Sequence, residues 1–183
     1  MSEEMLIEHC SPTLAGIKTG SLFSCKADNM EDIRRTIRAL NRMLGKKGLR
    51  ILPIRYRKGR ALIYVYRPAY LSRDLGDTTA REILDAKGYV CENAEACIAR
   101  LVKNLAMSDE FPHEIGLFLG YPPEDVRGFI ENKAEGFKYV GYWKVYGDAE
   151  KAKRLFEKYK KCTDVYSRHF AAGKSLERLA VGG

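Results

Sequence analysis

The segment FPHEIGLFLGYPPEDVRGFIENKAEGFKYVGYWKVYGD, residues 111–148, decides how the remaining chain is expected to fold. It contains six of the sixteen glycines, three of the six prolines and nine of the nineteen aromatic residues. Glycine and proline at this density indicate tight turns, and the aromatic side chains between them indicate a packed centre or a binding pocket. Its last part, FKYVGYWKVY at 137–146, has apolar residues on both faces and is therefore predicted to be a central strand.

The first part of this segment predicts two short helices, which start at Pro112 and at Pro122. Residues 109–131 hold six acidic groups and one basic group, whereas a helix that enters the major groove must approach phosphates. We therefore expect an acidic helical hairpin with a structural role rather than a DNA-reading element. The DNA-reading alternative rests on small and apolar residues at helix-turn-helix spacing: Ile115, Gly116, Leu119, Gly120 and Val126.

The remaining chain combines strands with helices. Strands are predicted at 21–25, 49–57 and 60–67, and helices at 30–44, 78–87, 93–107 and 149–171. Lys58-Gly59 predicts a hairpin turn, and Pro53 predicts that its strand lies at a sheet edge. Together these elements predict an α+β fold, a single globular domain over 1–183 with a four-stranded mixed sheet from strands 21–25, 49–56, 61–67 and 138–146. Their order allows a ferredoxin-like βαββαβ core with an elaborated helical layer.

One candidate site is thiol-dependent. Cys10 is expected between two short helices, just outside the N-terminus of the second, where backbone N–H groups favour a thiolate. Lys18 would add positive charge, and His113 with Glu114 would supply a base if the fold brings them to Cys10. The catalytic candidates are therefore Cys10, Lys18, His113 and Glu114. The favoured alternative is that Cys10 is a small buried hydrophobe at a helix start.

A second candidate surface is basic. Residues 33–73 hold thirteen Lys or Arg and no Asp or Glu. This asymmetry fits an anionic ligand, an acidic protein partner or nucleic acid, although the hairpin lacks the aromatic positions of an RNA-recognition signature. The favoured alternative is a solvated basic face. The candidate ligand-binding residues on one helix face and at the hairpin turn are Arg34, Arg38, Arg42, Arg57, Lys58 and Arg60.

A third candidate site is aromatic. Trp143, Lys144 and Tyr146, in the segment GYWKVY, are candidates for the floor of a ligand pocket. On a central strand, however, such side chains more often belong to the core. No Gly-rich phosphate loop, dinucleotide fingerprint or nucleophile elbow accompanies them, so any cofactor stays unknown from the sequence.

Composition limits the class of protein. The chain has 183 residues with 45% hydrophobic content, and no apolar run is long enough to cross a bilayer. The N-terminus MSEEMLIEHC is acidic and does not resemble a secretory signal, so we expect a cytoplasmic protein with no membrane partner. Five cysteines without a C-x-x-C pair predict reduced thiols, and the three scattered histidines predict no zinc site.

Three blocks carry a family resemblance: HCSPTLAGIKTGSLFSC at 9–25, EIGLFLGYPPEDVRGFIEN at 114–132, and GYWKVYGD at 141–148 followed by a Phe-x-x-Tyr-x-x-Cys helix. With them the whole chain resembles the bacterial family called domain of unknown function 3793. The resemblance implies a small, soluble, single-domain bacterial protein. It implies no activity, and it assigns no catalytic residue.

The resulting hypothesis is a non-catalytic ligand- or protein-binding domain. Two alternatives stay open. One is an anion or nucleic-acid binder that uses the 33–73 block, and the other is a thiol-dependent enzyme that uses Cys10.

Overall fold

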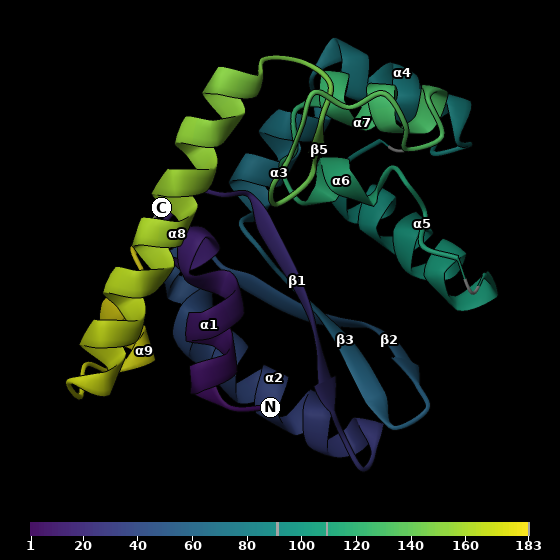
Figure 1. Ribbon diagram of the computed structural model, residues 1–183. Coiled ribbons are helices and arrows are strands. Elements are labelled where there is room, and N and C mark those ends of the chain that lie inside the picture. The colour runs from purple at the N-terminus through teal and green to yellow at the C-terminus, as the bar shows by residue number, and fades with distance from the viewer. Residues whose placement is uncertain (91, 109, 183) are drawn as a thin grey trace. The chain divides into compact units, whose positions relative to one another are not determined.

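A computed structural model describes residues 1–90, 92–108 and 110–182. The chain forms two compact units, Met1–Ala69 with Tyr159–Gly183, and Tyr70–Lys158. We call them unit 1 and unit 2 (Figure 1). The chain passes from one unit to the other within two helices, α3 (Pro68–Leu75) and α8 (Ala149–Ala171). None of the described helices combines the length and the apolar character needed to span a bilayer.

Unit 1 is built on a three-stranded antiparallel sheet in the order β1-β3-β2. Its strands are β1 (Gly20–Lys26), β2 (Arg50–Arg57) and β3 (Arg60–Tyr66). Phe23 pairs with Ile63, and Ile51 pairs with Val65, so their buried side chains share one face of the sheet. The helical elements of unit 1, besides parts of α3 and α8, are α1 (Glu3–Leu14), α2 (Met30–Leu44), η1 (Gly45–Lys47) and α9 (Leu176–Leu179).

The β2–β3 hairpin turns at Lys58 and Gly59, as the sequence predicts. Their φ angles are 48° and 70°, and a two-residue turn with both central residues at positive φ matches the twist of the flanking strands. β2 is an edge strand, and a bulge lies between Pro53 and Arg55. Proline is tolerated at such an edge because its missing N–H interrupts no inner ladder.

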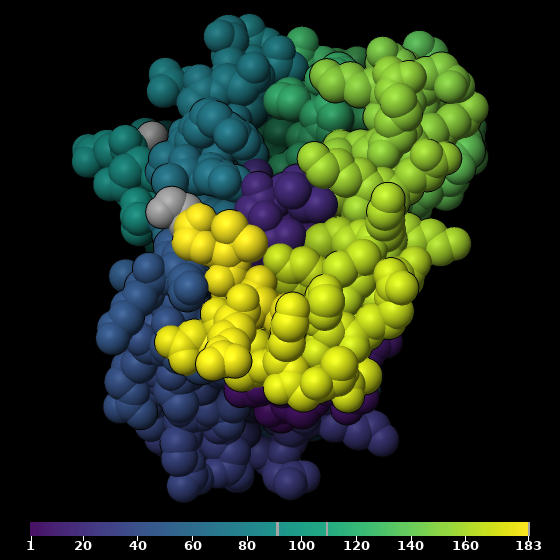
Figure 2. Space-filling view, turned by 90° about the vertical axis from the view of Figure 1, so that its left-hand side faces the viewer, coloured from purple at the N-terminus to yellow at the C-terminus, as the bar shows by residue number. Residues whose placement is uncertain are grey.

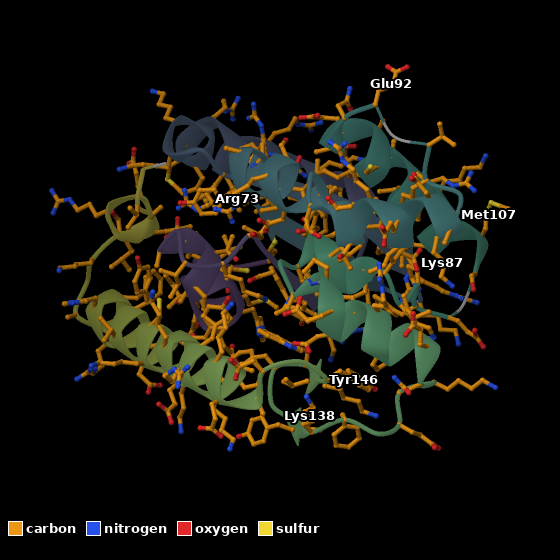
Figure 3. The ribbon with its side chains drawn as sticks, turned by 90° about the horizontal axis from the view of Figure 1, so that it is seen from above. Arg73, Lys87, Glu92, Met107, Lys138 and Tyr146 are labelled. Carbon is orange, nitrogen blue, oxygen red and sulfur yellow. The ribbon has the colours of Figure 1, made fainter. Side chains whose placement is uncertain are left out.

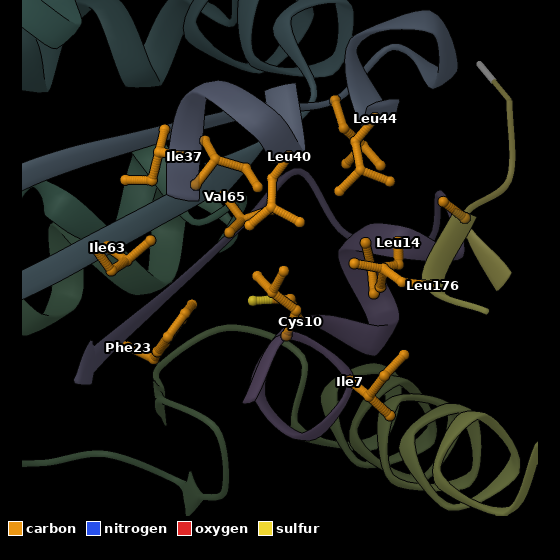
Figure 4. Close-up of a cluster of buried hydrophobic side chains, with 14 of the residues drawn as sticks. Ile7, Cys10, Leu14, Phe23, Ile37, Leu40, Leu44, Ile63, Val65 and Leu176 are labelled. Atoms are coloured by element: carbon orange, nitrogen blue, oxygen red, sulfur yellow. The ribbon is translucent and has the colours of Figure 1, made fainter. Parts of the chain in front are cut away.

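Helices α1 and α2 contribute to one apolar core with the sheet (Figure 4). Asn29 begins α2 by accepting a hydrogen bond from the Asp32 N–H at 2.9 Å, as a residue at the N-cap position does. Every third or fourth residue of α2 is buried: Ile33, Ile37, Leu40 and Leu44. At the helix's far end the Asn41 side chain exchanges two hydrogen bonds with the Ile51 backbone, which fixes α2 along the edge strand.

Arg67 connects the C-terminal residues to the rest of unit 1 by hydrogen bonds. The fully buried Arg67 guanidinium donates to the carbonyls of Thr13, Leu14 and Val181, each at 2.8 Å, and to that of Lys47 at 3.2 Å. In Figure 2 the yellow C-terminal residues accordingly lie against purple and blue residues of unit 1. One planar side chain thereby joins chain segments more than a hundred positions apart.

The N-terminal region differs from the expectation of two short helices. α1 runs unbroken from Glu3 to Leu14 with Pro12 inside it, and Ser2 supplies the cap. Pro12 lacks the N–H group that would bond to the Glu8 carbonyl, and its ring crowds that carbonyl, so α1 reaches Leu14 in spite of the proline. Packing of the buried Leu6, Cys10 and Leu14 against the sheet outweighs the local preference for a second helix that begins after Cys10.

Unit 2 is mainly helical. Its elements, besides parts of α3 and α8, are α4 (Thr78–Ala86), α5 (Ala94–Met107), α6 (Ile115–Phe118), α7 (Pro123–Glu131) and a two-stranded sheet of β4 (Tyr139–Val140) and β5 (Lys144–Val145). Asp77 caps α4 by accepting a hydrogen bond from the Ala80 N–H. Asn93 caps α5 in the same way, and Asp148 accepts from the Lys151 N–H at the start of α8.

The α+β class is confirmed, but the four-stranded sheet is wrong. Residues 137–146 form a separate hairpin, so the fourth strand of a ferredoxin-like core is missing. Gly141 explains why one long strand does not form. The chain bends there, and a Cβ atom at this position would lie 2.2 Å from the Phe156 ring. The apolar residues that suggested a buried strand are largely exposed on this hairpin, as the next section describes.

Candidate functional site

A pocket of about 340 Å³ lies within unit 2, and we call it the aromatic pocket. Its walls come from the chain just before and within α6, from α7, and from the β4–β5 hairpin. The lining residues are Phe111, Pro112, His113, Ile115, Gly116, Tyr121, Asp125, Val126, Phe129, Val140, Gly141, Tyr142, Trp143 and Lys144.

A buried carboxylate, Asp125, joins α7 to the hairpin. Its Oδ2 accepts a hydrogen bond from Trp143 Nε1 at 2.7 Å, and its Oδ1 accepts from the backbone N–H groups of Tyr146 and Gly147 at 2.8 Å. Three donors therefore satisfy both oxygens, as the burial of a carboxylate requires. This arrangement fixes the Trp143 indole in the pocket wall.

Aromatic packing holds the same indole on two further sides. The Trp143 ring stacks on Tyr121 with centroids 4.5 Å apart and planes 26° apart. It also meets Phe156 of α8 edge to face, with centroids 4.5 Å apart. Such geometries are the preferred ones for aromatic pairs. The pocket wall is therefore a rigid aromatic surface rather than a loose loop.

Two glycines let the walls approach closely. A Cβ atom on Gly116 of α6 would lie 2.8 Å from Val126, and one on Gly128 of α7 would lie 2.4 Å from the Tyr146 ring. Real Cβ atoms do not reach these distances, so a side chain at either position would push the elements apart. The glycine density of residues 111–148 thus reflects close packing of α6, α7 and the hairpin.

The rim of the pocket is apolar and exposed. Phe111, Val140 and Tyr142 line the pocket and keep between 39% and 50% of their surface accessible. Phe137 and Tyr139 of the same hairpin segment are also exposed. Contiguous apolar groups on a surface mark binding sites more often than scattered ones do. This concentration separates the hairpin from an ordinary solvated turn.

Two basic side chains reach the pocket. The Lys144 ammonium donates to the Ala134 carbonyl at 2.7 Å and lies 4.8 Å from the centroid of the Phe137 ring. The same ammonium is 5.9 Å from the centroid of Phe129, and the His113 ring meets Phe129 edge to face at 5.1 Å.

Tyr146, the third aromatic candidate, does not line the pocket but packs behind it. Its hydroxyl is buried and has no hydrogen-bond partner among the described residues. Burial, and then the nearby Asp125 carboxylate, raise the pKa of Tyr146. Figure 3 places Tyr146 and Lys138 on the segment that carries β4 and β5. Trp143 and Lys144 are thus the two predicted aromatic-site residues that line a cavity.

Cys10 lies in the interior of α1 and not at a helix N-terminus. Its side chain is fully buried and points into the apolar core of unit 1 (Figure 4). Burial raises the pKa of Cys10 to about 12, although the charge of Lys18 acts in the opposite direction. Burial likewise lowers the pKa of the half-buried Lys18 to about 8. The helix terminus on which the thiolate prediction depends is therefore absent.

The proposed base, His113 with Glu114, belongs to unit 2, whereas Cys10 and Lys18 belong to unit 1. Glu114 is buried and accepts a hydrogen bond from the Tyr89 hydroxyl at 3.0 Å. Burial, and then Glu114, raise the pKa of that hydroxyl. Glu114 therefore has a structural partner within its own unit, and His113 is an exposed residue at the aromatic pocket.

The basic candidates are exposed in unit 1. Arg34, Arg38 and Arg42 follow one another along the outer face of α2, and Arg38 forms an ion pair with Glu31 at 2.9 Å. Arg57, Lys58 and Arg60 surround the hairpin turn, where Arg60 donates to the Ser24 hydroxyl at 2.9 Å.

In the folded chain, acidic groups lie beside this basic surface. Tyr56 donates to the carbonyls of Ala27 and Asp28, which brings the hairpin end beside the start of α2. Glu31 and Asp32 lie in that first helical turn, just outside the acid-free block in the sequence. The block is therefore less basic as a surface than it is as a sequence.

The described cysteines differ in whether they form a disulfide. Cys10, Cys25 and Cys162 form no disulfide, whereas Cys97 is disulfide-bonded, so the prediction of reduced thiols is wrong for Cys97. No group of His, Cys, Asp or Glu in the described part of the chain is arranged to hold a metal ion.

The sequence prediction missed most of the aromatic pocket. Asp125 suggested only a charge in the first turn of a helix, because its three donors lie about twenty positions further along the chain. Tyr121, Phe129 and Tyr142 could have been found from the aromatic density of residues 111–148.

The sequence profile of the family described as protein of unknown function, DUF3793, matches residues 6–180. The chain therefore belongs to this family, which confirms the resemblance carried by the three sequence blocks. No curated protein and no solved structure matches the chain.

Proposed function

We propose that this member of the DUF3793 family is a non-catalytic binding protein whose aromatic pocket takes a small apolar ligand. The observation that carries the proposal is a pocket of about 340 Å³ with an exposed aromatic rim and a fixed indole in its wall. Sites for small molecules are concave, mostly apolar and supplied with a few fixed polar groups. The aromatic pocket has each of these properties.

Its polar groups suit binding better than catalysis. Both oxygens of Asp125 already accept hydrogen bonds, so this carboxylate is occupied as a structural acceptor. None of the described lining residues is a Ser, Thr or Cys, the residues that most often act as nucleophiles. Lys144 and His113 are the remaining polar side chains that reach the cavity, apart from the tyrosine hydroxyls.

The wall is also preorganised for binding. Asp125, Tyr121 and Phe156 hold the Trp143 ring in place before any ligand arrives. Binding to a ring that is already fixed costs the protein less conformational entropy than binding to a ring that must first become ordered. Rigid aromatic residues are for this reason common in binding surfaces.

The experiment uses Trp143, the only tryptophan of the chain. Titration with the neutral dye N-phenyl-1-naphthylamine should quench the indole emission and raise the dye emission by energy transfer, with saturation at one dye per chain. The variant Val140→Asp places a charge on the exposed rim and should weaken binding by about tenfold, because burial of a carboxylate beside the dye is costly. Val90→Asp is the matched control, since Val90 is exposed in the same unit and does not line the pocket. Absence of saturable binding, or equal losses in the two variants, would refute the proposal.

A second candidate function is anion binding by unit 1. The observation in its favour is that Arg34 and Arg42 are exposed on α2 and have no ion-pair partner among the described residues. The acidic groups at the start of α2 argue against a strong field, so we rank this candidate second. It predicts an affinity for polyanions that falls as the salt concentration rises.

A further inference from the structure

The unused hydrogen-bonding capacity of the described lining residues indicates which polar group the ligand of the aromatic pocket carries. Lys144 is the one lysine that lines the pocket, and its ammonium donates to the neutral Ala134 carbonyl. An ammonium group has three protons, so two donors remain after this bond. Lys144 forms no ion pair with a carboxylate among the described residues, and the other groups near it are the rings of Phe129 and Phe137. The Lys144 ammonium therefore has donors left for a ligand at the cavity.

Asp125, the one carboxylate among the described lining residues, stays ionised but forms no ion pair with Lys144. Asp125 directs its two oxygens to Trp143 and to the backbone N–H groups of Tyr146 and Gly147. Hydrogen bonds from three donors stabilise the ionised form where it lies. Asp125 consequently has little acceptor capacity left for Lys144 or for a cationic ligand.

Aromatic pockets can also bind cations on their ring faces, but this pocket argues against that alternative. The Lys144 ammonium already lies over the Phe137 and Phe129 rings, at 4.8 Å and 5.9 Å from their centroids. A second cation would compete for the same faces and would be repelled by the first. His113, which contacts Phe129, adds a second basic side chain to this side of the lining.

We infer that the ligand of the aromatic pocket is an amphiphilic organic anion, an aromatic or aliphatic body that carries one acidic group. The body packs on Trp143 and Tyr121, and the acidic group accepts hydrogen bonds from Lys144 with His113 beside it. This inference rests on the proposed function, because it presupposes that the pocket binds a ligand. It adds the sign of the ligand's charge and the residue that recognises it.

The test compares two dyes with the same ring system. 1-Anilinonaphthalene-8-sulfonate carries one sulfonate group, and N-phenyl-1-naphthylamine carries none. With the intact chain, the sulfonate dye should bind more tightly than the neutral dye, and both should quench Trp143. Lys144→Gln should weaken the sulfonate dye by about tenfold, since charge-assisted hydrogen bonds are lost, and should change the neutral dye by less than about twofold.

Lys138→Gln is the matched control. Lys138 lies on the same hairpin segment, and its ammonium also donates to a backbone carbonyl, that of Gly147 at 3.0 Å, but it does not line the pocket. The inference expects Lys138→Gln to leave both dyes unchanged. Lys144→Arg should retain most of the sulfonate affinity, because the charge and the donors persist. Retained binding of the neutral dye shows that a variant keeps the pocket folded. If Lys144→Gln unfolds, His113→Gln replaces it, with a smaller expected loss of affinity for the sulfonate dye.

The outcomes separate the two proposals. Absence of saturable binding of the neutral dye would overturn the proposed function itself. Binding of the neutral dye with equal or weaker binding of the sulfonate dye would overturn the anion inference and leave the proposed function standing. Equal losses in Lys144→Gln and Lys138→Gln would also overturn the inference, because the sulfonate dye would then report general surface charge.

Discussion

The Nε1 atom of Trp143 lies 2.7 Å from Oδ2 of Asp125, and both side chains are buried. The same carboxylate receives the N–H groups of Tyr146 and Gly147, so a single side chain of α7 orders the end of the β4–β5 hairpin and the wall of the pocket. The pocket's shape therefore depends on a residue that contributes little apolar surface of its own.

Replacement of Asp125 by Ala should lower the free energy of unfolding by about 3 kcal/mol, because three buried donors lose their acceptor. Asp125→Asn should cost less, since its carbonyl oxygen can still accept from the two backbone N–H groups. Urea denaturation followed by circular dichroism measures both values. The emission of Trp143 should shift to longer wavelength in Asp125→Ala, and an unshifted spectrum would contradict the structural role.

Replacement of Gly128 by Ala should destabilise the protein by about 2 kcal/mol, because overpacking forces backbone or side-chain shifts. The added methyl group would lie 2.4 Å from the Tyr146 ring. Gly182→Ala is the control, since no atom lies within 4 Å of its added Cβ position. Equal unfolding midpoints for the two variants would show that α7 and the hairpin are not packed as described.

Arg67 provides a prediction for unit 1. Arg67→Lys keeps the positive charge but cannot reproduce the planar fork that binds the carbonyls of Thr13, Leu14 and Val181. We expect a loss of about 2 kcal/mol or more in the free energy of unfolding, together with faster amide exchange in the C-terminal residues. Arg34→Lys on the exposed face of α2 should be nearly neutral. Unchanged C-terminal exchange in Arg67→Lys would contradict the role of the guanidinium.

The pH dependence of stability should show Lys18 and Cys10 acting in opposite directions. Folding lowers the pKa of Lys18 from 10.5 to about 8, so the unfolded state binds more protons between these values and stability rises with pH there. Folding raises the pKa of Cys10 from 9.0 to about 12, so stability falls with pH across that window. Lys18→Met should therefore remove a rise in stability between pH 8 and 9. Denaturant titrations at several pH values measure it, and an identical profile in Lys18→Met would refute this assignment.

The fold of unit 1 could be predicted from the sequence because its signals are local. Asn29 with Asp32 marks the start of α2, and Lys58-Gly59 supplies the positive φ angles of the hairpin turn. Each of these signals spans four residues or fewer, so no distant contact is needed to decide between alternatives. Cys10 shows the opposite case, since its place inside α1 depends on packing against a sheet that the sequence around it does not encode.

The sequence indicates where the pocket of unit 2 lies, but not which contacts form it. Aromatic and glycine density indicated residues 111–148 as a centre, and Trp143 with Lys144 proved to line a cavity. The pattern of residues 137–146 predicts a central strand and not a hairpin, because apolar residues on both faces are typical of burial in a sheet as well as of a pocket rim. Only the contacts of Gly141 with Phe156 and of Asp125 with Trp143 decide between the two.

The last prediction concerns the basic surface of unit 1. If the second candidate function is correct, the chain binds heparin or single-stranded nucleic acid with an affinity that falls as salt rises, because bound cations are released from the polyanion. Arg34→Glu with Arg42→Glu should then reduce the slope of log affinity against log salt by at least about 1.4, from a contribution of about 0.7 for each phosphate contact on single strands. Lys160→Glu with Lys161→Glu makes the same change in net charge on the exposed part of α8 and should alter the slope less. Because Glu31 and Asp32 lie at the start of α2, we expect the native affinity to be weak near physiological ionic strength. Equal slopes in the two double variants would show that the polyanion responds to net charge alone, and α2 would then be a solvated basic face.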